Sequence, residues 1–298
     1  MGVDSMTGGA VSHPSAERGP TVLRIALGGQ LRKLREEREI SRQAAGDALR
    51  ASETKITRLE LGQTGFKERD VHDLLTLYGV DDADERDRFL GLARQASRPG
   101  WWHRYTDLLP SWFETYVGLE QAAFGIRIYE TQYIPGLFQT ADYARYIFGL
   151  DSREEAQRLV DMRMRRQRIL TREPNPPRVW AVIDEHVLCR QPPDPRVARD
   201  QLRHLLKLIE LPNVTVQVLP ETAGPTPAEG GSFTMLRFPE PELPDIVYLE
   251  QLTSALYLDK RQDLLRYRNL MDTLCAAYAQ PPEQTATFLQ TLLDAQPS

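Results

Sequence analysis

The hydrophobic positions in the first third of the chain repeat at helical spacing, with charged residues between them. Leu27, Leu31 and Leu34 show this period within residues 23–35. Ser41 and Ser52 each precede a further periodic segment, at the place where an N-cap residue accepts a hydrogen bond from the first helical turn. These signals predict an all-α bundle of five helices at 23–35, 41–49, 52–61, 68–78 and 82–96.

From residue 98 onward the chain mixes helical and strand periods, after a break at Pro99 and Gly100. Helices are expected at 111–124, 140–149, 152–170, 195–210, 260–279 and 282–295. Strands are expected at 126–130, 178–183, 214–219 and 231–238, with either two strands or one bent strand at 246–258. This order lacks the regular alternation of a doubly wound fold, so we expect an α+β domain with a mixed or mostly antiparallel sheet.

Length and composition fit two globular domains. The chain has 298 residues, 41% of them hydrophobic and 27% charged, against about 100–200 residues for a typical domain. Residues 1–22 include many Gly, Ser and Pro residues and no apolar core, which indicates a disordered leader and not a secretory signal. We therefore expect a leader at 1–22, an all-α domain at 23–97 and an α+β domain at 98–298.

Cysteine usage and hydropathy predict a cytoplasmic protein. Cys189 and Cys275 are too few for a disulfide framework and match no metal-ligand spacing. No stretch approaches the ~18 uninterrupted apolar residues of a membrane span. We expect no metal, no cofactor and no membrane partner.

One short block is basic inside an acidic protein. The formal net charge is −5, but residues 24–67 carry ten basic and six acidic side chains. Residues 68–97 carry four basic and eight acidic side chains, and residues 98–298 also have a net negative charge. A single basic module in an acidic chain is the distribution expected when that module contacts phosphate.

The basic block contains the arrangement of a helix-turn-helix. Two short helices, the second of about nine residues and capped by serine, are separated by a three-residue turn. Residues 41–62 closely resemble the Cro/repressor (XRE-type) family, with its small residue at Gly46 and its Glu–x–Gly ending at Glu60 and Gly62. The core apolar positions of that family fall on Ala45, Leu49, Ile56 and Leu59. The sequence departs from the family at Arg50, where Gly is usual at the turn.

The resemblance implies a recognition helix at 52–61 that enters the major groove of DNA. With Ile56 and Leu59 packed inward, the residues that face base edges are Ser52, Glu53, Thr54, Thr57 and Arg58. Arg58 suits a bidentate contact with guanine, and Glu53 can accept a hydrogen bond from the cytosine amine. The residues expected near phosphate are Arg42, Gln43, Arg50, Lys55 and Lys67. A plain helical bundle with a solvated charged face is the competing interpretation.

Motifs in the larger domain resemble one known domain. They lie at 101–105, 112–120, 134–140, 211–215 and 248–252. Together with the helix-turn-helix they are similar, over residues 23–293, to XRE-type proteins of Streptomyces and related actinomycetes that carry an uncharacterised C-terminal domain. That group includes WhiJ-like developmental regulators and antitoxin-like proteins. The resemblance implies transcriptional control of development or secondary metabolism, frequently with a small acidic partner protein encoded nearby, and it supplies no catalytic residue.

Several residues of this domain are candidates for a ligand or partner pocket, because such sites are largely apolar with a few polar groups. The candidates are Trp101, Trp102, Tyr105, Glu120, Tyr133, Pro135, Phe138 and Glu250. Trp112, Phe113 and Tyr116 fit a pocket too, although their helical spacing favours core packing. Glu120 and Glu250 lie in apolar surroundings, where a carboxylate needs a partner. Bonding to loop backbone is the favoured role of these two, and holding a ligand or a partner residue is the alternative.

The long predicted helix at 152–170 carries Arg158, Arg165 and Arg172 in a stripe, beside Arg163, Arg166 and Arg168. Leu159, Met162, Ile169 and Leu170 occupy the opposite side. A solvated face is the favoured interpretation of the arginines. A supplementary phosphate contact or a surface for an acidic partner is the alternative.

The motifs favour a regulator over an enzyme. The sequence has no Gly-rich phosphate loop, no nucleophile elbow and no paired His–carboxylate metal motif, and Asp184-Glu185-His186 near Cys189 has no assisting residue at a useful spacing. A single helix-turn-helix makes few contacts, so we expect a homodimer on double-stranded DNA, associated with the nucleoid. Two alternatives stay open: an antitoxin-like protein that sequesters a small acidic partner, and a sensor of a small-molecule effector.

Overall fold

The computed structural model describes residues 20–62, 64–149, 152–190, 192–228, 230–239 and 243–296. Residues 1–19 of the predicted leader lie outside the described residues. Residues 20–22 do not belong to a leader, because helix α1 runs from Pro20 to Glu37. Pro20 is the first helical residue, a position where the fixed φ of proline favours the helix and its missing N–H costs nothing.

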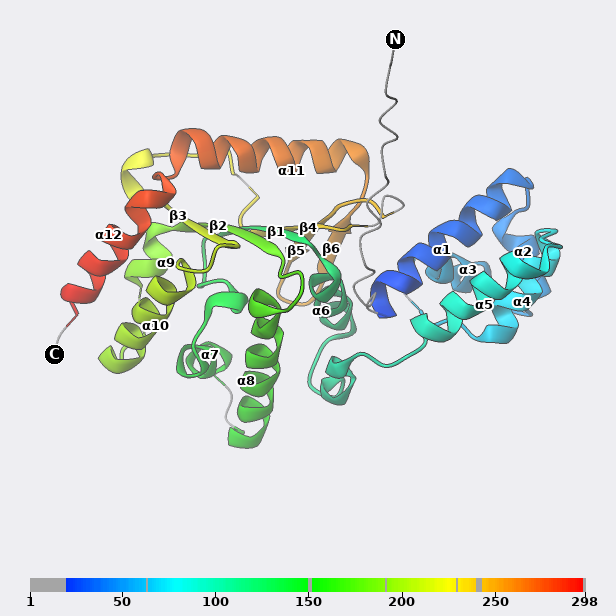
Figure 1. Ribbon diagram of the computed structural model, residues 1–298, viewed down its shortest axis with the longest axis horizontal. Helices are drawn as coiled ribbons and strands as arrows, with labels where there is room; N and C mark the ends of the chain where they lie inside the picture. The colour runs from blue at the N-terminus through cyan, green and yellow to red at the C-terminus, as the bar shows by residue number, and fades with distance from the viewer. Residues whose placement is uncertain are drawn as a thin grey trace, which may run out of the picture.

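The first domain has the five predicted helices (Figure 1). They are α1 (Pro20–Glu37), α2 (Arg42–Ala48), α3 (Glu53–Glu60), α4 (Glu68–Leu77) and α5 (Ala83–Ala96). Ser41 and Ser52 are N-caps as predicted, because each side-chain oxygen accepts a hydrogen bond from a backbone N–H three residues later. The domain has a hydrophobic core of its own, which includes Leu27, Leu31, Ile56, Leu59, Val71 and Leu75.

The second domain is built on a six-stranded mixed sheet of order β3-β2-β1-β4-β5-β6. The strands are β1 (Gly125–Glu130), β2 (Arg178–Asp184), β3 (Val214–Leu219), β4 (Phe233–Arg237), β5 (Ile246–Glu250) and β6 (Ala255–Leu258). Strands β1 to β3 pair in parallel, and the remaining pairings are antiparallel. The predicted α+β class is confirmed. The segment 246–258 forms two strands and not one bent strand.

Helices cover both faces of this sheet (Figure 1). One face is packed by α6 (Ser111–Ala122), α7 (Ala141–Phe148), α8 (Arg153–Gln167), α10 (Pro195–Leu208) and α12 (Pro282–Asp294). The other face is covered by α11 (Arg261–Thr273), which continues into a π-helical turn, η5 (Leu274–Tyr278). The short elements are η1 (Trp101–Tyr105), η2 (Gly136–Phe138), η3 (Arg168–Thr171), α9 (Glu185–Cys189) and η4 (Glu221–Ala223). None of the helices in the described ranges has the length and apolar character needed to cross a membrane.

Helix α1 belongs to both domains. Its C-terminal half carries Leu27 and Leu31 into the core of the first domain. Its first turn places Val22, which is fully buried, in the core of the second domain together with Leu119 of α6. Figure 1 shows this end of α1 directed at α6. One rigid element therefore connects the two cores.

Candidate functional site

The turn between α2 and α3 leaves very little space. An added Cβ at Gly46 would lie 2.8 Å from the carbonyl oxygen of Ala51, so a larger residue would push the two helices apart. Arg50, which replaces the usual Gly of the resembled family, has a φ of 51°. A non-glycine residue in this left-handed region costs roughly 1–2 kcal/mol. The turn thus keeps the conformation that normally favours glycine, while the Arg50 side chain is exposed.

Helix α3 is held firmly from its inner side. Ile56 and Leu59 are each only 1% exposed. The carboxylate of Glu60 accepts two hydrogen bonds from the buried guanidinium of Arg35 on α1, at 2.5 and 3.0 Å. At Gly28 the backbones of α1 and α3 meet, because an added Cβ there would lie 2.4 Å from the carbonyl oxygen of Leu59. These contacts fix the axis and the rotation of α3.

The outer side of α3 carries the residues predicted to contact bases. Ser52, Glu53, Thr54 and Arg58 are exposed. Thr57 is half-buried, and its hydroxyl donates to the backbone carbonyl of Glu53 at 3.2 Å. The helix therefore presents a polar strip of side chains on a rigid support.

The predicted phosphate-contacting residues differ in how freely they can bind. Lys67 and Arg50 are exposed, and so is Gln43, whose amide donates to Asp47 at 2.9 Å. Arg42 is half-buried and donates to Glu60 at 3.2 Å. The ammonium of Lys55 donates to Asp70 at 2.7 Å. Lys55 is thus already paired within the domain, so a contact with phosphate would require this pair to open.

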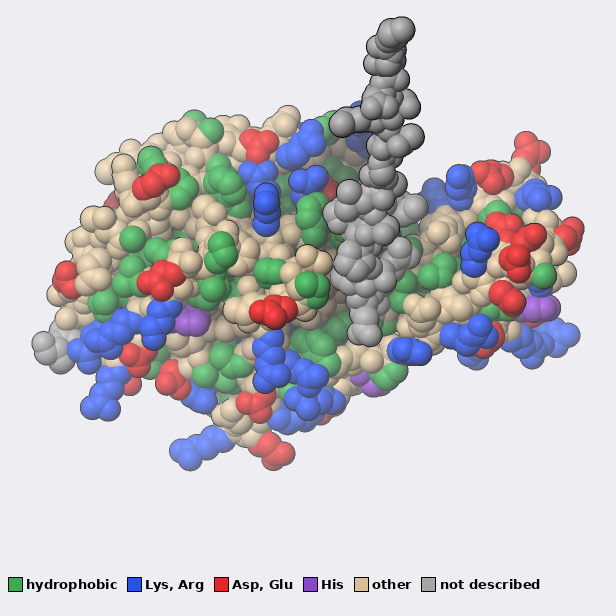
Figure 2. All heavy atoms as spheres, viewed as in Figure 1, with side chains coloured by type: hydrophobic (Ala, Val, Ile, Leu, Met, Phe, Trp, Pro, Cys, Tyr) green, Lys and Arg blue, Asp and Glu red, His purple; other side chains and the backbone are tan. Residues whose placement is uncertain are grey.

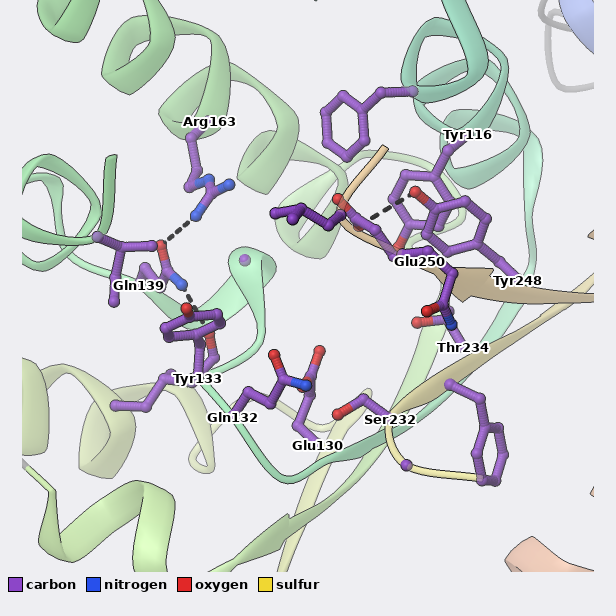
Figure 3. A pocket seen from close by; sticks show the side chains of 18 of the residues that line it. Tyr116, Glu130, Gln132, Tyr133, Gln139, Arg163, Ser232, Thr234, Tyr248 and Glu250 are labelled. Carbon is purple, nitrogen blue, oxygen red and sulfur yellow. Dashed lines mark hydrogen bonds between the residues drawn. The ribbon is translucent and has the colours of Figure 1, made fainter. Parts of the chain in front are cut away.

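A cavity of about 640 Å³ lies in the second domain, between α6, α8, the segment after β1 and the ends of β4 and β5. Its lining mixes aromatic and polar side chains (Figure 3). The lining includes the side chains of Trp112, Phe113, Tyr116, Glu130, Gln132, Tyr133, Gln139, Arg163, Arg166, Ser232, Thr234, Tyr248 and Glu250. The volume falls within the ~300–1,000 Å³ typical of sites for small molecules.

A buried ion pair forms one wall of this cavity. The guanidinium of Arg166 on α8 donates to both oxygens of Glu120 on α6, at 2.8 and 2.7 Å, and both side chains are buried. Burial alone would lower the pKa of the Arg166 guanidinium, but the facing Glu120 carboxylate outweighs it and raises that pKa. The guanidinium also lies over the rings of Phe113 and Tyr116, at 5.1 and 5.4 Å from their centres. The charge of Arg166 is therefore compensated inside the protein.

Arg163, one helical turn away from Arg166, forms no ion pair with a carboxylate of the described residues, and the more distant charges of Glu250 and Glu120 compensate its charge only in part. Its Nη1 donates to the side-chain oxygen of Gln139 at 2.6 Å, and its guanidinium lies 4.4 Å from the centre of the Phe148 ring. Its Nε is buried and has no hydrogen-bond partner among the described residues. Burial lowers the pKa of Arg163 to about 10, and the positive charge of Arg166 acts in the same direction. Arg163 therefore remains a cation at neutral pH.

Two carboxyl groups line another part of the cavity. Burial raises the pKa of the Glu130 carboxyl to about 7, and the Glu250 carboxylate contributes in the same direction. Glu250 accepts a hydrogen bond from the Tyr248 hydroxyl at 3.1 Å. Burial raises the pKa of that hydroxyl, and the negative charge of Glu250 raises it further. Among the described residues neither carboxyl forms an ion pair with a basic side chain.

The predicted pocket residues only partly coincide with this cavity. Tyr133 and Glu250 line it. Glu120 does not line it but pairs with Arg166, which does. Glu120 pairs with a side chain, and Glu250 accepts from the Tyr248 hydroxyl, so neither shows the favoured bond to loop backbone. The remaining candidates do not line it: Trp101, Trp102, Tyr105, Pro135 and Phe138.

The failed candidates pack elsewhere for simple reasons. Phe138 is fully buried in the main core, and Pro135 is also buried. Trp101 packs edge-on against Trp102 and Tyr105, beside the small cluster of Leu109 and Met162. The chain turns after this segment, so α6 presents its aromatic residues to the cavity: Trp112, Phe113 and Tyr116. These three residues therefore line the cavity and also pack on the main core, as their helical spacing favoured.

The arginines of α8 do not form the solvated face that the sequence suggested. Lys and Arg side chains reach the surface around this helix in Figure 2. Arg168 is exposed, whereas the other five arginines named above have partners within the domain. Arg158 forms two hydrogen bonds with Asp107, at 2.6 and 2.8 Å. Arg165 lies over the ring of Trp101, and Arg172 donates to the backbone carbonyl of Gln121. Arg166 was missed as a site residue, although it falls on the apolar stripe four residues after Met162.

Two families match this chain. One, described as "Domain of unknown function (DUF5753)", matches residues 113–291, and another, described as "Helix-turn-helix domain", matches residues 26–89. Comparisons with curated proteins and with solved structures give no match. In the described part of the chain no group of three or more His, Cys, Asp or Glu side chains is placed to hold a metal ion. The first match covers the cavity, and the second covers α2, the turn and α3.

Proposed function

The chain belongs to the DUF5753 family, and we propose that it is a transcriptional regulator that binds double-stranded DNA sequence-specifically through α3. The observation that carries the proposal is the contrast between the two sides of α3. The inner side is locked by Ile56, Leu59 and the Arg35–Glu60 pair, while the outer side leaves Thr54 and Arg58 exposed. A recognition helix needs both properties, because base contacts require exposed side chains on a fixed support.

The roles of the outer residues follow from their chemistry. The Arg58 guanidinium can donate two hydrogen bonds to the O6 and N7 atoms of guanine, and the Glu53 carboxylate can accept one from the cytosine amine. Ser52, Thr54 and Thr57 supply hydroxyl groups at the same face. Arg50, Lys67 and Gln43 are exposed at the ends of the neighbouring elements, where they support contact with the phosphate backbone.

We also propose that the protein acts as a homodimer. One helix-turn-helix covers only a few base pairs, and dimers of such domains bind half-sites about 34 Å apart, one turn of the duplex. The bound sequence should then be pseudo-palindromic. The actinomycete family that the sequence resembles supports a role in development or secondary metabolism, which genome-wide mapping of bound sites would test.

Selection of bound duplexes from a random pool tests the DNA-binding proposal. The full chain should enrich a pseudo-palindromic sequence, and sedimentation should give two chains per duplex. Arg88→Ala is a suitable control for variants of Arg58, because Arg88 is also an exposed arginine but lies on α5, outside the α2–turn–α3 unit. It should enrich the same sequence as the wild-type chain. Failure to enrich any sequence, with a folded protein, would refute the proposal.

We propose an additional, sensory role for the second domain. Trp112 and Tyr116 of α6 line the cavity, and Leu119 of the same helix shares a core with Val22 of α1. An occupant of the cavity could therefore shift α6 and, through it, α1 and the DNA-binding domain. Val22→Ala, which loosens this connection far from α3, should reduce any change in DNA affinity that an occupant of the cavity causes. An equally large change in the variant and in wild type would contradict the coupling through Val22.

A further inference from the structure

We infer that the cavity of the second domain binds a zwitterionic small molecule of the size of a di- or tripeptide, held by Arg163 at its carboxylate and by Glu130 and Glu250 at its amine. This inference deepens the sensory role proposed above and does not depend on DNA binding. It rests on the charged side chains that line the cavity and on the remaining lining.

Arg163 is the proposed partner of the ligand's carboxylate. In Figure 3 its side chain reaches from α8 into the cavity toward Gln139. Only Nη1 has a recorded acceptor, and the buried Nε has none within the described residues. A buried donor without a partner is costly, so an acceptor at this edge of the guanidinium would be stabilising. Arg166 shows which group fits, because its Nε and Nη2 hold the two oxygens of a carboxylate.

The carboxyl groups of Glu130 and Glu250 are the proposed partners of the ligand's ammonium group. Figure 3 shows Glu130 and Glu250 at the cavity on elements other than the helix that carries Arg163. The Glu250 carboxylate helps to raise the pKa of Glu130, and no basic side chain of the described residues forms an ion pair with either carboxyl group. An ammonium group between them would relieve this repulsion. The Tyr116 and Tyr248 rings, which stack on each other at 4.2 Å between centres, lie beside Glu250.

Size and lining indicate a peptide-like body. A cavity of about 640 Å³ lies in the middle of the ~300–1,000 Å³ range for small-molecule sites, larger than a single amino acid requires. The amides of Gln132 and Gln139 and the hydroxyls of Ser232 and Thr234 can both donate to and accept from peptide groups. Trp112 and Phe113 add apolar surface for a side chain.

The test uses the full chain without DNA. Native mass spectrometry with an equimolar mixture of free dipeptides should show one-to-one complexes. Calorimetry with the best-bound dipeptide should then show at least a tenfold loss of affinity when its amine is acetylated, and a similar loss when its carboxyl is amidated. Absence of binding at millimolar concentration, or equal binding of a blocked form, would overturn the inference.

Two variants and a control locate the site. Glu250→Gln keeps an acceptor for the Tyr248 hydroxyl and is on an exposed side chain, so the protein should fold and bind the dipeptide at least tenfold more weakly. Arg163→Gln should weaken binding by a similar factor. Arg165→Gln, on the same helix but packed on Trp101 outside the cavity, should leave affinity unchanged. Equal affinity in Glu250→Gln and wild type would contradict the inference, and it would leave DNA binding through α3 unaffected.

Discussion

Each domain contains a buried, bidentate pair of an arginine and a glutamate, and the two pairs serve different sites. Arg35 and Glu60 join α1 to α3 in the helical domain, at 2.5 and 3.0 Å. Arg166 and Glu120 join α8 to α6 in the other domain, at 2.8 and 2.7 Å. The first pair stands behind a surface strip, and the second stands in the wall of a cavity.

The difference shows how one interaction can prepare two kinds of binding. Behind α3, the Arg35–Glu60 pair keeps the Glu60 carboxylate buried, and Arg58 stays exposed and able to bind an external partner. Beside the cavity, the pair neutralises Arg166 and leaves Arg163 as the cation without a carboxylate among the described residues. In both domains the pair fixes a helix, and a neighbouring arginine two or three residues away remains available.

The largest effect is expected when the cavity pair is broken. Glu120→Gln leaves the Arg166 charge buried without a countercharge, which should lower the free energy of unfolding by about 3–5 kcal/mol. Urea unfolding followed by tryptophan fluorescence measures this domain alone, because Trp101, Trp102, Trp112 and Trp180 all follow residue 100. The double variant Glu120→Leu, Arg166→Met should recover most of the loss, and no recovery would show that packing, not charge, dominates.

Breaking the other pair should cost less. Glu60→Gln should reduce the stability of the helical domain by about 2–3 kcal/mol, below the cost for a fully buried pair. The reason is that Arg35 retains the backbone carbonyl of Ile40 at 2.8 Å and the exposed carboxylate of Glu36 at 3.4 Å. Far-UV circular dichroism should show the loss while tryptophan fluorescence does not move. A shift of the fluorescence transition would mean that the domains unfold as one unit.

The cavity should also make stability depend on pH through Glu130. Its pKa in the folded protein, about 7, lies above the ordinary value of 4.5, so the folded state holds more protons than the unfolded state between these values. Stability should therefore fall as the pH rises from 4.5 through 7, by about 1–3 kcal/mol. Glu130→Gln should remove this slope in a series of urea unfolding curves, and an unchanged slope would assign it to other groups.

The smallest effect distinguishes two lysines of the helical domain. Lys67 is exposed, so Lys67→Ala should weaken binding to all DNA sequences equally and reduce the slope of log affinity against log salt by about 1. Lys55 is paired with Asp70, so Lys55→Ala should leave that slope unchanged. Fluorescence anisotropy over a range of salt concentrations measures both. Equal slopes in the two variants would contradict the distinction.

The sequence was sufficient for the helical domain because its signals are local. The caps at Ser41 and Ser52 and the periods around Ile56 and Leu59 each involve a few consecutive residues. The cavity is different, since residues as distant as Trp112 and Glu250 meet only after the sheet has formed. Helical periodicity could not show that Arg158 faces Asp107 while Arg163 faces Gln139, because both partners lie in other elements.

The central claim is that the outer side of α3 distinguishes base pairs, and the most direct test combines Arg58→Ala with substitutions in the selected site. For the wild-type chain, replacing the G·C pair that Arg58 contacts should cost about 1–3 kcal/mol of binding free energy. For Arg58→Ala the same replacement should cost nothing, while substitutions elsewhere in the site keep their effect. If Arg58→Ala shows the wild-type preference at every base pair, α3 does not read the sequence.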